Sequence, residues 1–391
     1  MAGRLHIAHA VREAFLSRGV VQSLVMPSAL SRMTFSRVAE ACWAWLRSWA
    51  RRPLLPLQCA LFSASSDVDR LIEAIDDRVE TVYLDGVRLH TLLRALRTRR
   101  PDLRLVVDLD DLMSRRARLL LEMRQAMAPG YVAANLPFGL KRLLSAPLID
   151  RLVPRYEEAT LIEVEKDALR LADAVVLLSS TDTDELRRRS GGVQDVRATI
   201  HNIPPSVHLH DGPPMAALKR FVFIGSDSLT QNRLTIDFLL QRWSEWRLST
   251  PLVIYGHQQR NLALPPNVSM PGYADSIADV YDGASALVTP SFVGGGVKTK
   301  VLEAFSYGAA VIGNPCTFES LPVDDYPLLI DDNARLREIL SDPAAHLDVF
   351  LRAARLGQAY VREHHSEQRF NERWLNVVAA TTDEARIGHV R

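Results

Sequence analysis

The chain has 391 residues, of which 47% are hydrophobic and 24% charged, a composition typical of a water-soluble globular protein with about two domains. No apolar run approaches the roughly 18 residues of a membrane span, and the N-terminal residues lack the apolar core of a signal peptide. Three cysteines without metal-like spacing favour a reducing cytoplasm and argue against a disulfide framework or a structural metal.

The net charge of +1 is unevenly distributed along the chain. Residues 1–60 carry eight arginines and two glutamates, so this end is strongly basic while the rest is slightly acidic. The basic end is therefore the part expected to meet an acidic surface. Binding to nucleic acid is not expected, because the sequence contains no recognised nucleic-acid-binding module.

Short apolar runs alternate with helix-period segments through the first half. Strands are predicted at 20–26, 57–62, 81–84, 103–109 and 174–179, with helices such as 68–76 and 89–98 between them. This alternation is typical of a parallel sheet covered by helices on both faces. The segment Gly3–Phe15 already reads as a helix, with no strand before it. A missing central strand would expose two sheet edges, so we expect the natural chain to begin upstream of Met1.

An amphipathic helix is predicted over residues 35–52. Apolar residues recur on it at helical spacing, namely Phe35, Val38, Cys42, Trp45 and Trp49. Its arginines lie mostly elsewhere around the helix, at Arg37, Arg47, Arg51 and Arg52. Tryptophan combined with arginine suits an interface with anionic lipid, which would make the protein peripheral to a membrane. The alternative is a helix packed into the first domain by its tryptophans, with a solvated basic face.

The strand predicted at 103–109 leads into Asp108, Asp110 and Asp111. Alternate residues of a strand face the same way, so Asp108 and Asp110 are expected to share a face. Parallel sheets bind ligands at this end of their strands, which makes Asp110 a catalytic candidate and Asp108 a possible one. The alternative is that these residues cap the next helix, a role that suits Asp111 best. Arg88 follows another strand and either faces the same site or pairs with Asp85.

A helix further along carries Glu163, Glu165 and Asp167, for which a solvated face is expected. Residues 201–218 are predicted to be a linker, because four prolines and no periodicity mark 201–215. The α/β pattern then resumes with strands predicted at 221–225, 252–256, 268–270, 286–289 and 309–312. The chain is therefore divided into a first domain (1–200), this linker, a second domain (219–364) and a final segment (365–391) with an amphipathic helix.

The segment 290–315, PSFVGGGVKTKVLEAFSYGAAVIGNP, places three glycines and two lysines between a strand and a helix. Glycines let a backbone approach a ligand closely, and a helix N-terminus attracts anions. Lysines at that position oppose the helix dipole, so an anionic ligand is expected to offset them. Glu303, about one turn on, is placed to accept a hydrogen bond from a sugar hydroxyl. These features together predict a site for a diphosphate attached to a ribose; the alternative is a flexible loop followed by a solvated first turn.

This segment resembles the C-terminal domain of retaining glycosyltransferases with the GT-B fold, in the large group that includes family 4. The shared pattern is Pro290 and Ser291, the glycine loop, a helix opened by Leu302–Ala304, and Gly308 before a final strand. The resemblance extends over residues 219–330. Residues 221–243 look like the first strand and loop of that domain, and residues 267–291 look like its base-binding strand and the following helix.

The resemblance implies an α/β protein of two Rossmann-like domains facing each other across a cleft, with a last helix that crosses back to the first domain. It also implies a nucleotide-diphospho-sugar donor, held by the second domain without a metal or other cofactor. The donor-binding residues carried over are Gly225, Ser226, Asn232, Gly294, Gly295, Gly296, Val297, Lys298, Thr299, Lys300 and Glu303.

The chain departs from the family pattern at two places. Many members carry two glutamates eight positions apart, the second of which corresponds to Glu303 here. The first usually contacts the donor sugar, and its position is occupied by Gly295. Members also often hold the diphosphate with an Arg and a Lys after the first loop. Here that loop is SDSLTQNR, so Lys298 and Lys300 are expected to supply the charge, with Arg233 as a further candidate. In family 4 the acidic strand often ends in His-Asp, and Asp110 stands where the His would be.

We therefore predict a retaining hexosyltransferase that moves a sugar from a nucleotide-diphospho-sugar to a glycan or lipid-linked acceptor, in the assembly of bacterial surface or exopolysaccharide. One alternative is a GT-B nucleotide-sugar epimerase, which shares the diphosphate site and needs no acceptor. Another is a non-catalytic partner protein that retains the fold.

Overall fold

The computed structural model describes residues 35–50, 53–123, 149–211, 215–321, 323 and 325–379. These residues form two compact units. One comprises the described parts of 1–204 and 370–391, and the other those of 205–369. The strand predicted at 20–26, the helix predicted at Gly3–Phe15, and Arg51 and Arg52 lie outside the described residues.

The first unit contains a sheet of four parallel strands in the order β1-β2-β3-β4. The strands are β1 (Thr81–Asp85), β2 (Arg104–Asp110), β3 (Ala174–Leu177) and β4 (Thr199–Asn202). The helices that accompany them are α2 (Phe35–Ala50), α3 (Leu57–Ala60), α4 (Ser65–Glu73), η2 (Val87–Leu89), α5 (His90–Arg99), α6 (Met113–Glu122), α9 (Ile149–Leu171), α10 (Ser180–Ser190) and α16 (Glu367–Ala379).

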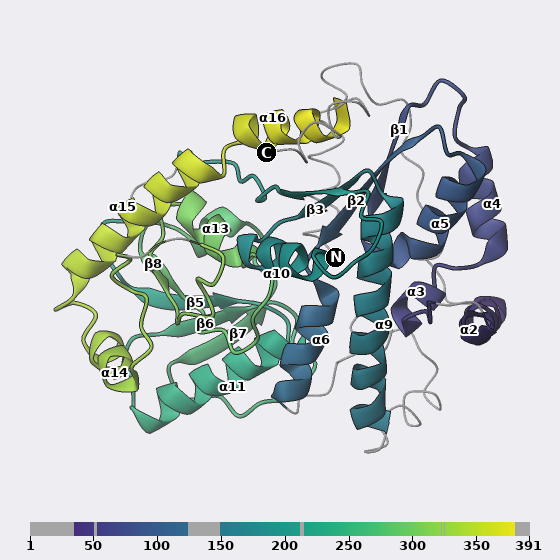
Figure 1. Ribbon diagram of the computed structural model, residues 1–391. Helices are drawn as coiled ribbons and strands as arrows, with labels where there is room; N and C mark the ends of the chain where they lie inside the picture. The colour runs from purple at the N-terminus through teal and green to yellow at the C-terminus, as the bar shows by residue number, and fades with distance from the viewer. Residues whose placement is uncertain are drawn as a thin grey trace. The chain divides into compact units, whose positions relative to one another are not determined.

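Side-chain alternation along the strands separates the core of this unit into two layers. Leu105, Val107 and Leu109 of β2 pack with residues of α5 and α9. Val106, between them, joins a second cluster around Trp374 of α16. Helix α16 therefore covers one face of the sheet while α5 and α9 cover the other (Figure 1). From Phe370 on, the last helix that the structure describes is thus part of the first unit.

Two predictions about local structure in this unit are wrong. Residues 57–62, predicted as a strand, contain helix α3. Pro56, with φ of −54°, starts the turn, and its carbonyl accepts hydrogen bonds from the amides of Cys59 and Ala60 at 3.0 Å each. A proline with this φ favours a helical first turn, and the apolar run is too short for its period to decide. The segment assigned to the linker begins with His201 and Asn202, which form the end of β4.

The second unit contains five parallel strands in the order β7-β6-β5-β8-β9. They are β5 (Arg220–Ile224), β6 (Leu252–Tyr255), β7 (Val268–Gly272), β8 (Ser285–Val288) and β9 (Val311–Ile312), so all five strands predicted for this half are confirmed. The chain builds outward from β5 to β7 and then returns to add β8 on the opposite side of β5. Ligands bind at such a reversal, beyond the carboxyl ends of the two strands that flank it, here β5 and β8.

The helices of the second unit are α11 (Thr230–Glu245), α12 (Ile277–Val280), α13 (Thr299–Ser306), α14 (Asn333–Ser341) and α15 (Leu347–His364). Helix α11 buries Ile236, Leu239 and Trp243 in the core, on the opposite side of the sheet from α13 and α15 (Figure 1). Helices α13 and α15 approach closely at Gly357, where a Cβ would lie 2.2 Å from the ring of Phe305. Helix α13, which follows the glycine loop, is therefore packed tightly against α15.

Candidate functional site

The loops after β5 and β8 are joined through the side chain of Asn232. Its Nδ2 donates to the carbonyl of Ser226 at 3.0 Å, and its Oδ1 accepts from Nζ of Lys300 at 3.0 Å. Position 225 has to be glycine, because a Cβ there would lie 2.7 Å from the Asn232 side chain. Four residues assigned to one donor site from the sequence, Gly225, Ser226, Asn232 and Lys300, are thus brought together.

A buried carboxylate that the sequence analysis did not single out holds the loop after β5. Asp227 accepts from the amides of Gln259 and Arg260 at 2.8 and 3.1 Å, and from Nε of Arg260 at 3.1 Å. Burial acts to raise the pKa of Asp227, but these hydrogen bonds outweigh it and keep the pKa below its usual value. The side chain of Gln258 adds bonds to the amide of Asp227 and the carbonyl of Gly225. The loop is therefore fixed against the loop after β6.

The glycine loop after β8 has a defined shape that requires glycine. Gly295 and Gly296 have φ values of +92° and +66°, in the region that residues with a Cβ avoid. Nζ of Lys298 donates to the carbonyl of Gly295 at 2.7 Å, and α13 begins at the next residue, Thr299. Val297 packs against the core of the unit. The loop is thus a turn held by its own lysine, with the exposed Thr299 at the start of α13.

Lys300 lies in surroundings that disfavour its charge. Its Nζ is 4.3 Å from the ring centroid of Phe223, a core residue of β5, and contacts the amide oxygen of Asn232. Burial lowers the pKa of the Lys300 ammonium to about 7, and the nearby charge of Lys298 acts in the same direction. An anionic ligand placed at this ammonium would favour its charged form.

Glu303 lies one helical turn beyond Lys298 and Thr299, half-buried on α13. Its charge adds to the effect of burial in raising the pKa of the phenols of Tyr281 and Tyr307. The ring of Tyr307 stacks on His210, with centroids 3.7 Å apart. The Glu303 carboxylate thus lies within the electrostatic reach of two tyrosines, one of which, Tyr307, follows the C-terminal end of α13.

The carboxyl end of β2 in the first unit holds Asp108 and Asp110. Asp108 is 2% exposed and accepts from the hydroxyl of Tyr83 at 2.7 Å and from the amide of Asp110 at 2.9 Å. Burial raises the pKa of Asp108 to about 7, and the charge of Asp110 adds to this. Asp110 has a φ of +65°, and the pairing of β2 with β3 shifts register between the two aspartates. The regular alternation on which their shared face was predicted is therefore interrupted here.

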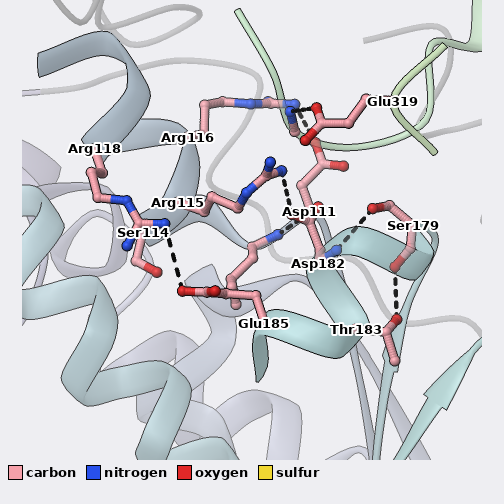
Figure 2. A network of polar contacts seen from close by, with 12 residues as sticks. Asp111, Ser114, Arg115, Arg116, Arg118, Ser179, Asp182, Thr183, Glu185 and Glu319 are labelled. Atoms are coloured by element: carbon pink, nitrogen blue, oxygen red, sulfur yellow. Dashed lines mark hydrogen bonds and ion pairs between the residues drawn. The ribbon is translucent and has the colours of Figure 1, made fainter. Parts of the chain in front are cut away.

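Asp111 does not cap helix α6, so that prediction is wrong. The N-cap position is Leu112, which makes no side-chain capping bond, while the Asp111 carboxylate pairs with Arg116 (Figure 2). The amide of Ser114 donates instead to Glu165 at 2.9 Å, and that of Leu112 to Asp182 at 3.4 Å. Carboxylates from distant parts of the chain have taken the capping role.

Glu165 and Asp167 are also buried, contrary to the predicted solvated face. Glu165 is 2% exposed, and burial raises its pKa to about 7 although Ser114 donates two hydrogen bonds to it. Asp167 binds His90 at 3.0 Å and Arg94 at 2.8 Å. Glu163 is half-exposed and pairs with Lys166 on the same helix, so the prediction holds for this residue.

Arg88 lies in η2, directly after β1. Its charge acts to lower the pKa values of Glu157 and Cys59, although burial raises both. Its assignment to the site stays a prediction. Within the described ranges, no three His, Cys, Asp or Glu side chains gather in a way that would hold a metal ion.

Helix α2 buries a different side from the one predicted. Ala41 and Ser48 are buried, and Nε1 of Trp45 donates to the hydroxyl of Tyr156 at 2.6 Å. Trp43 and Trp49 are 57% and 58% exposed. In the part of the chain that the structure describes, no helix is both long and apolar enough to cross a membrane.

Comparison with known proteins finds a family model that is similar to part of the chain. Residues 218–340 match the family described as glycosyl transferases group 1. No curated protein sequence matches the chain. Sucrose-phosphate synthase from Thermosynechococcus elongatus has a similar structure, with a TM-score of 0.54 and 16% identity over 78% of this chain and 76% of that one.

Two further solved structures are similar over most of this chain. HepE from Anabaena, in complex with UDP and glucose, gives a TM-score of 0.56 and 13% identity over 84% of this chain and 82% of that one. A mutant of TarM from S. aureus, in complex with fondaparinux, alpha-GlcNAc-glycerol and UDP, gives 0.57 and 13% over 82% of this chain and 59% of that one. The α/β architecture with parallel sheets in two Rossmann-like units is that of the GT-B fold, as predicted.

Proposed function

We propose that the chain is a glycosyltransferase that takes its sugar from a nucleotide-diphospho-sugar. The observation that carries the proposal is the gathering of Lys298, Lys300 and the glycine loop at the carboxyl ends of β5 and β8, where the strand order reverses. A pair of cations beside a turn that needs glycine suits a diphosphate. The match of residues 218–340 to glycosyl transferases group 1, and the UDP in complexes of two similar structures, support this reading.

Within this proposal, the two lysines stabilise the leaving diphosphate and Glu303 accepts hydrogen bonds from the ribose. The sugar is a hexose, transferred with retention of anomeric configuration to a glycan or a lipid-linked acceptor. The setting is the assembly of bacterial surface or exopolysaccharide, on the cytoplasmic side of the membrane. These points rest on the resemblance of the C-terminal half to retaining GT-B enzymes.

Asp110 is the proposed catalytic residue. An aspartate at the carboxyl end of a parallel strand, held at a φ of +65°, is a conformation that costs free energy and persists only where the surroundings enforce it. Here the Asp110 amide donates a hydrogen bond to Asp108, which supports this conformation. A carboxylate in this role stabilises oxocarbenium-like charge or orients the acceptor hydroxyl.

A thermal-shift screen tests the donor assignment. Ligands that bind only the folded state raise its apparent stability, so a nucleoside diphosphate and its sugar conjugate should both raise the unfolding temperature, whereas the free sugar should not. The screen covers UDP-glucose, UDP-N-acetylglucosamine, GDP-mannose and ADP-glucose with their parent diphosphates. No shift with any of them would contradict the proposal. Product analysis after incubation with the best donor alone then separates a transferase from an epimerase, which needs no acceptor.

Helix α2 is proposed to dock on an anionic membrane surface. Trp43, Leu46 and Trp49 are each more than half exposed, while Trp45 is tied to Tyr156 and anchors the helix to its unit. The guanidinium of Arg47 lies 5.1 Å from the ring of Trp43. Tryptophans beside arginine on one exposed surface suit the headgroup region, and the basic charge of residues 1–60 complements anionic lipid.

Co-sedimentation with phosphatidylglycerol or phosphatidylcholine vesicles tests the docking surface. Wild type should bind only the anionic vesicles and lose binding as salt rises, because each arginine near the surface contributes about 1 kcal/mol through the leaflet's potential. A variant with Arg37, Arg47, Arg51 and Arg52 changed to Ser should not bind. A control with equal charge loss elsewhere changes the exposed Arg70, Arg78, Arg187 and Arg188 to Ser and should bind normally. If both variants sediment equally, α2 does not dock on the membrane and has only a structural role.

A further inference from the structure

A carboxylate from outside the glycine loop contacts the backbone of that loop. Oε2 of Glu319 accepts a hydrogen bond from the amide of Gly295 at 2.8 Å. Glu319 lies in the segment after β9, 24 residues further along the chain. In the resembling enzymes, position 295 carries a glutamate side chain that usually contacts the donor sugar. The missing carboxyl group is thus present at this position, but it comes from a different residue.

The backbone at Gly295 explains why the carboxylate has to come from elsewhere. A φ of +92° is strained for any residue with a Cβ, so a glutamate at position 295 would disturb the turn that carries Lys298. The same residue separates two opposite charges. Its carbonyl accepts from the Lys298 ammonium at 2.7 Å, and its amide donates to the Glu319 carboxylate at 2.8 Å. Groups of opposite charge therefore contact the Gly295 backbone, a cation at its carbonyl and a carboxylate at its amide.

The segment that carries Glu319 is fixed to the strand that leads into the glycine loop. The amide of Ser291 donates to the side chains of Asn314 and Thr317, and Nδ2 of Asn314 donates back to the Ser291 carbonyl at 2.8 Å. The hydroxyl of Thr317 donates to the carbonyl of Thr289 at 2.7 Å. The next residue, Phe318, is buried against Tyr326, with ring centroids 5.1 Å apart. The Glu319 carboxylate is therefore placed by the fold.

We propose that Glu319 is a specificity-determining residue that accepts hydrogen bonds from hydroxyl groups of the donor sugar. A carboxylate repels a diphosphate and accepts from hydroxyls, so the lysine end suits the phosphates and the Glu319 end suits the sugar. The assignment rests on the proposed function, because it deepens the description of the same donor site.

Isothermal titration of UDP and UDP-glucose into wild type and Glu319→Gln tests the assignment. The variant keeps the shape of the side chain and removes its charge. It should bind UDP-glucose about tenfold more weakly, as expected for loss of hydrogen bonds to a charged acceptor, and bind UDP within about twofold of wild type. Glu319→Asp, which keeps the charge on a shorter arm, should give an intermediate loss. Glu338→Gln, an exposed acid in α14, is the matched control and should bind both ligands normally.

Each other outcome overturns the assignment in a distinguishable way. Equal weakening of both ligands would mean that Glu319 only holds the loop, and a lowered unfolding temperature would accompany it. Tighter binding of both would mean that the carboxylate competes with the diphosphate. Unchanged binding of both would remove Glu319 from the site. A wild type that binds neither UDP nor UDP-glucose contradicts the proposed function on this donor, and the assignment falls with it.

Discussion

The carboxyl ends of β8 and β2 hold opposite charges under similar physical conditions. After β8, Lys300 contacts an amide and an aromatic ring, and burial lowers the pKa of its ammonium. Near the carboxyl end of β2, Asp108 accepts a hydrogen bond from Tyr83, and burial raises the pKa of its carboxyl group. Both groups have a pKa of about 7, far from their ordinary values. In each case burial favours the neutral form.

This comparison indicates what each end is suited to meet. A buried amine gains most from an anion, since a negative charge nearby restores its preferred charged form. A buried carboxyl group gains most from positive charge, which is the kind of charge that develops on a sugar ring during transfer. The β8 end therefore suits an anionic group and the β2 end suits a group with positive charge. Three substitutions test this division, in order of decreasing expected effect.

Asp110→Asn should lower kcat by about 100-fold or more and change donor affinity little. Under the proposed function it removes a charge that stabilises the transition state, and such groups are worth about that much. Asparagine also tolerates a positive φ, so the fold should be kept. Turnover of a donor and its acceptor measures the effect, and Asp102→Asn, an exposed residue before β2, is the control. If the Asp110→Asn variant turns over normally, Asp110 has a structural role and is not the catalytic residue.

Glu303→Ala should weaken donor binding by about ten- to a hundredfold, because it removes a charged acceptor from the ribose. Titration of UDP-glucose and of UDP should show the same loss, since both carry the ribose. This pattern differs from the one expected of Glu319→Gln, in which only the sugar conjugate is affected. If the variant binds as tightly as wild type, Glu303 is not the ribose acceptor.

The affinity of wild type for UDP-glucose should fall about tenfold between pH 7 and pH 8.5. Without a ligand, burial lowers the pKa of Lys300 to about 7. A bound diphosphate raises this pKa, so binding above pH 7 is coupled to protonation of Lys300. The affinity therefore falls as the pH rises. Titration at several pH values measures this. Lys300→Met should bind more weakly and show a flat profile, whereas Lys219→Met, on an exposed lysine, should keep the slope. A wild-type affinity that rises with pH would contradict the assignment.

The sequence predicted the elements whose hydrophobic pattern is long and regular. All five strands of the second unit were found this way, since each contributes apolar residues to the core of the unit. The glycine loop and Lys300 were found because their signal is local, a strand followed by glycines and a basic first turn. The helix at 57–60 was missed because the four residues after Pro56 are too few to show helical periodicity.

Contacts between distant residues account for the rest. Glu165 was predicted to be solvated, yet its partners Ser114 and Arg189 lie 51 and 24 residues away. Glu319 was overlooked for a similar reason, because its hydrogen bond to the Gly295 amide joins residues 24 positions apart and involves a backbone group that any residue could supply. The one available clue was the absence of a glutamate at Gly295, which indicated that a carboxylate should be sought elsewhere.

The close contact between α13 and α15 limits how this protein can be engineered. Glycine inside a helix such as α15 costs about 1 kcal/mol relative to alanine, so position 357 looks like an easy target for a thermostabilising change. A methyl group there would meet the Phe305 ring at 2.2 Å and push against the helix that follows the glycine loop. A gain in helix propensity at Gly357 would thus be offset by a clash with Phe305 of α13, and designers seeking a more heat-resistant protein should leave this glycine unchanged.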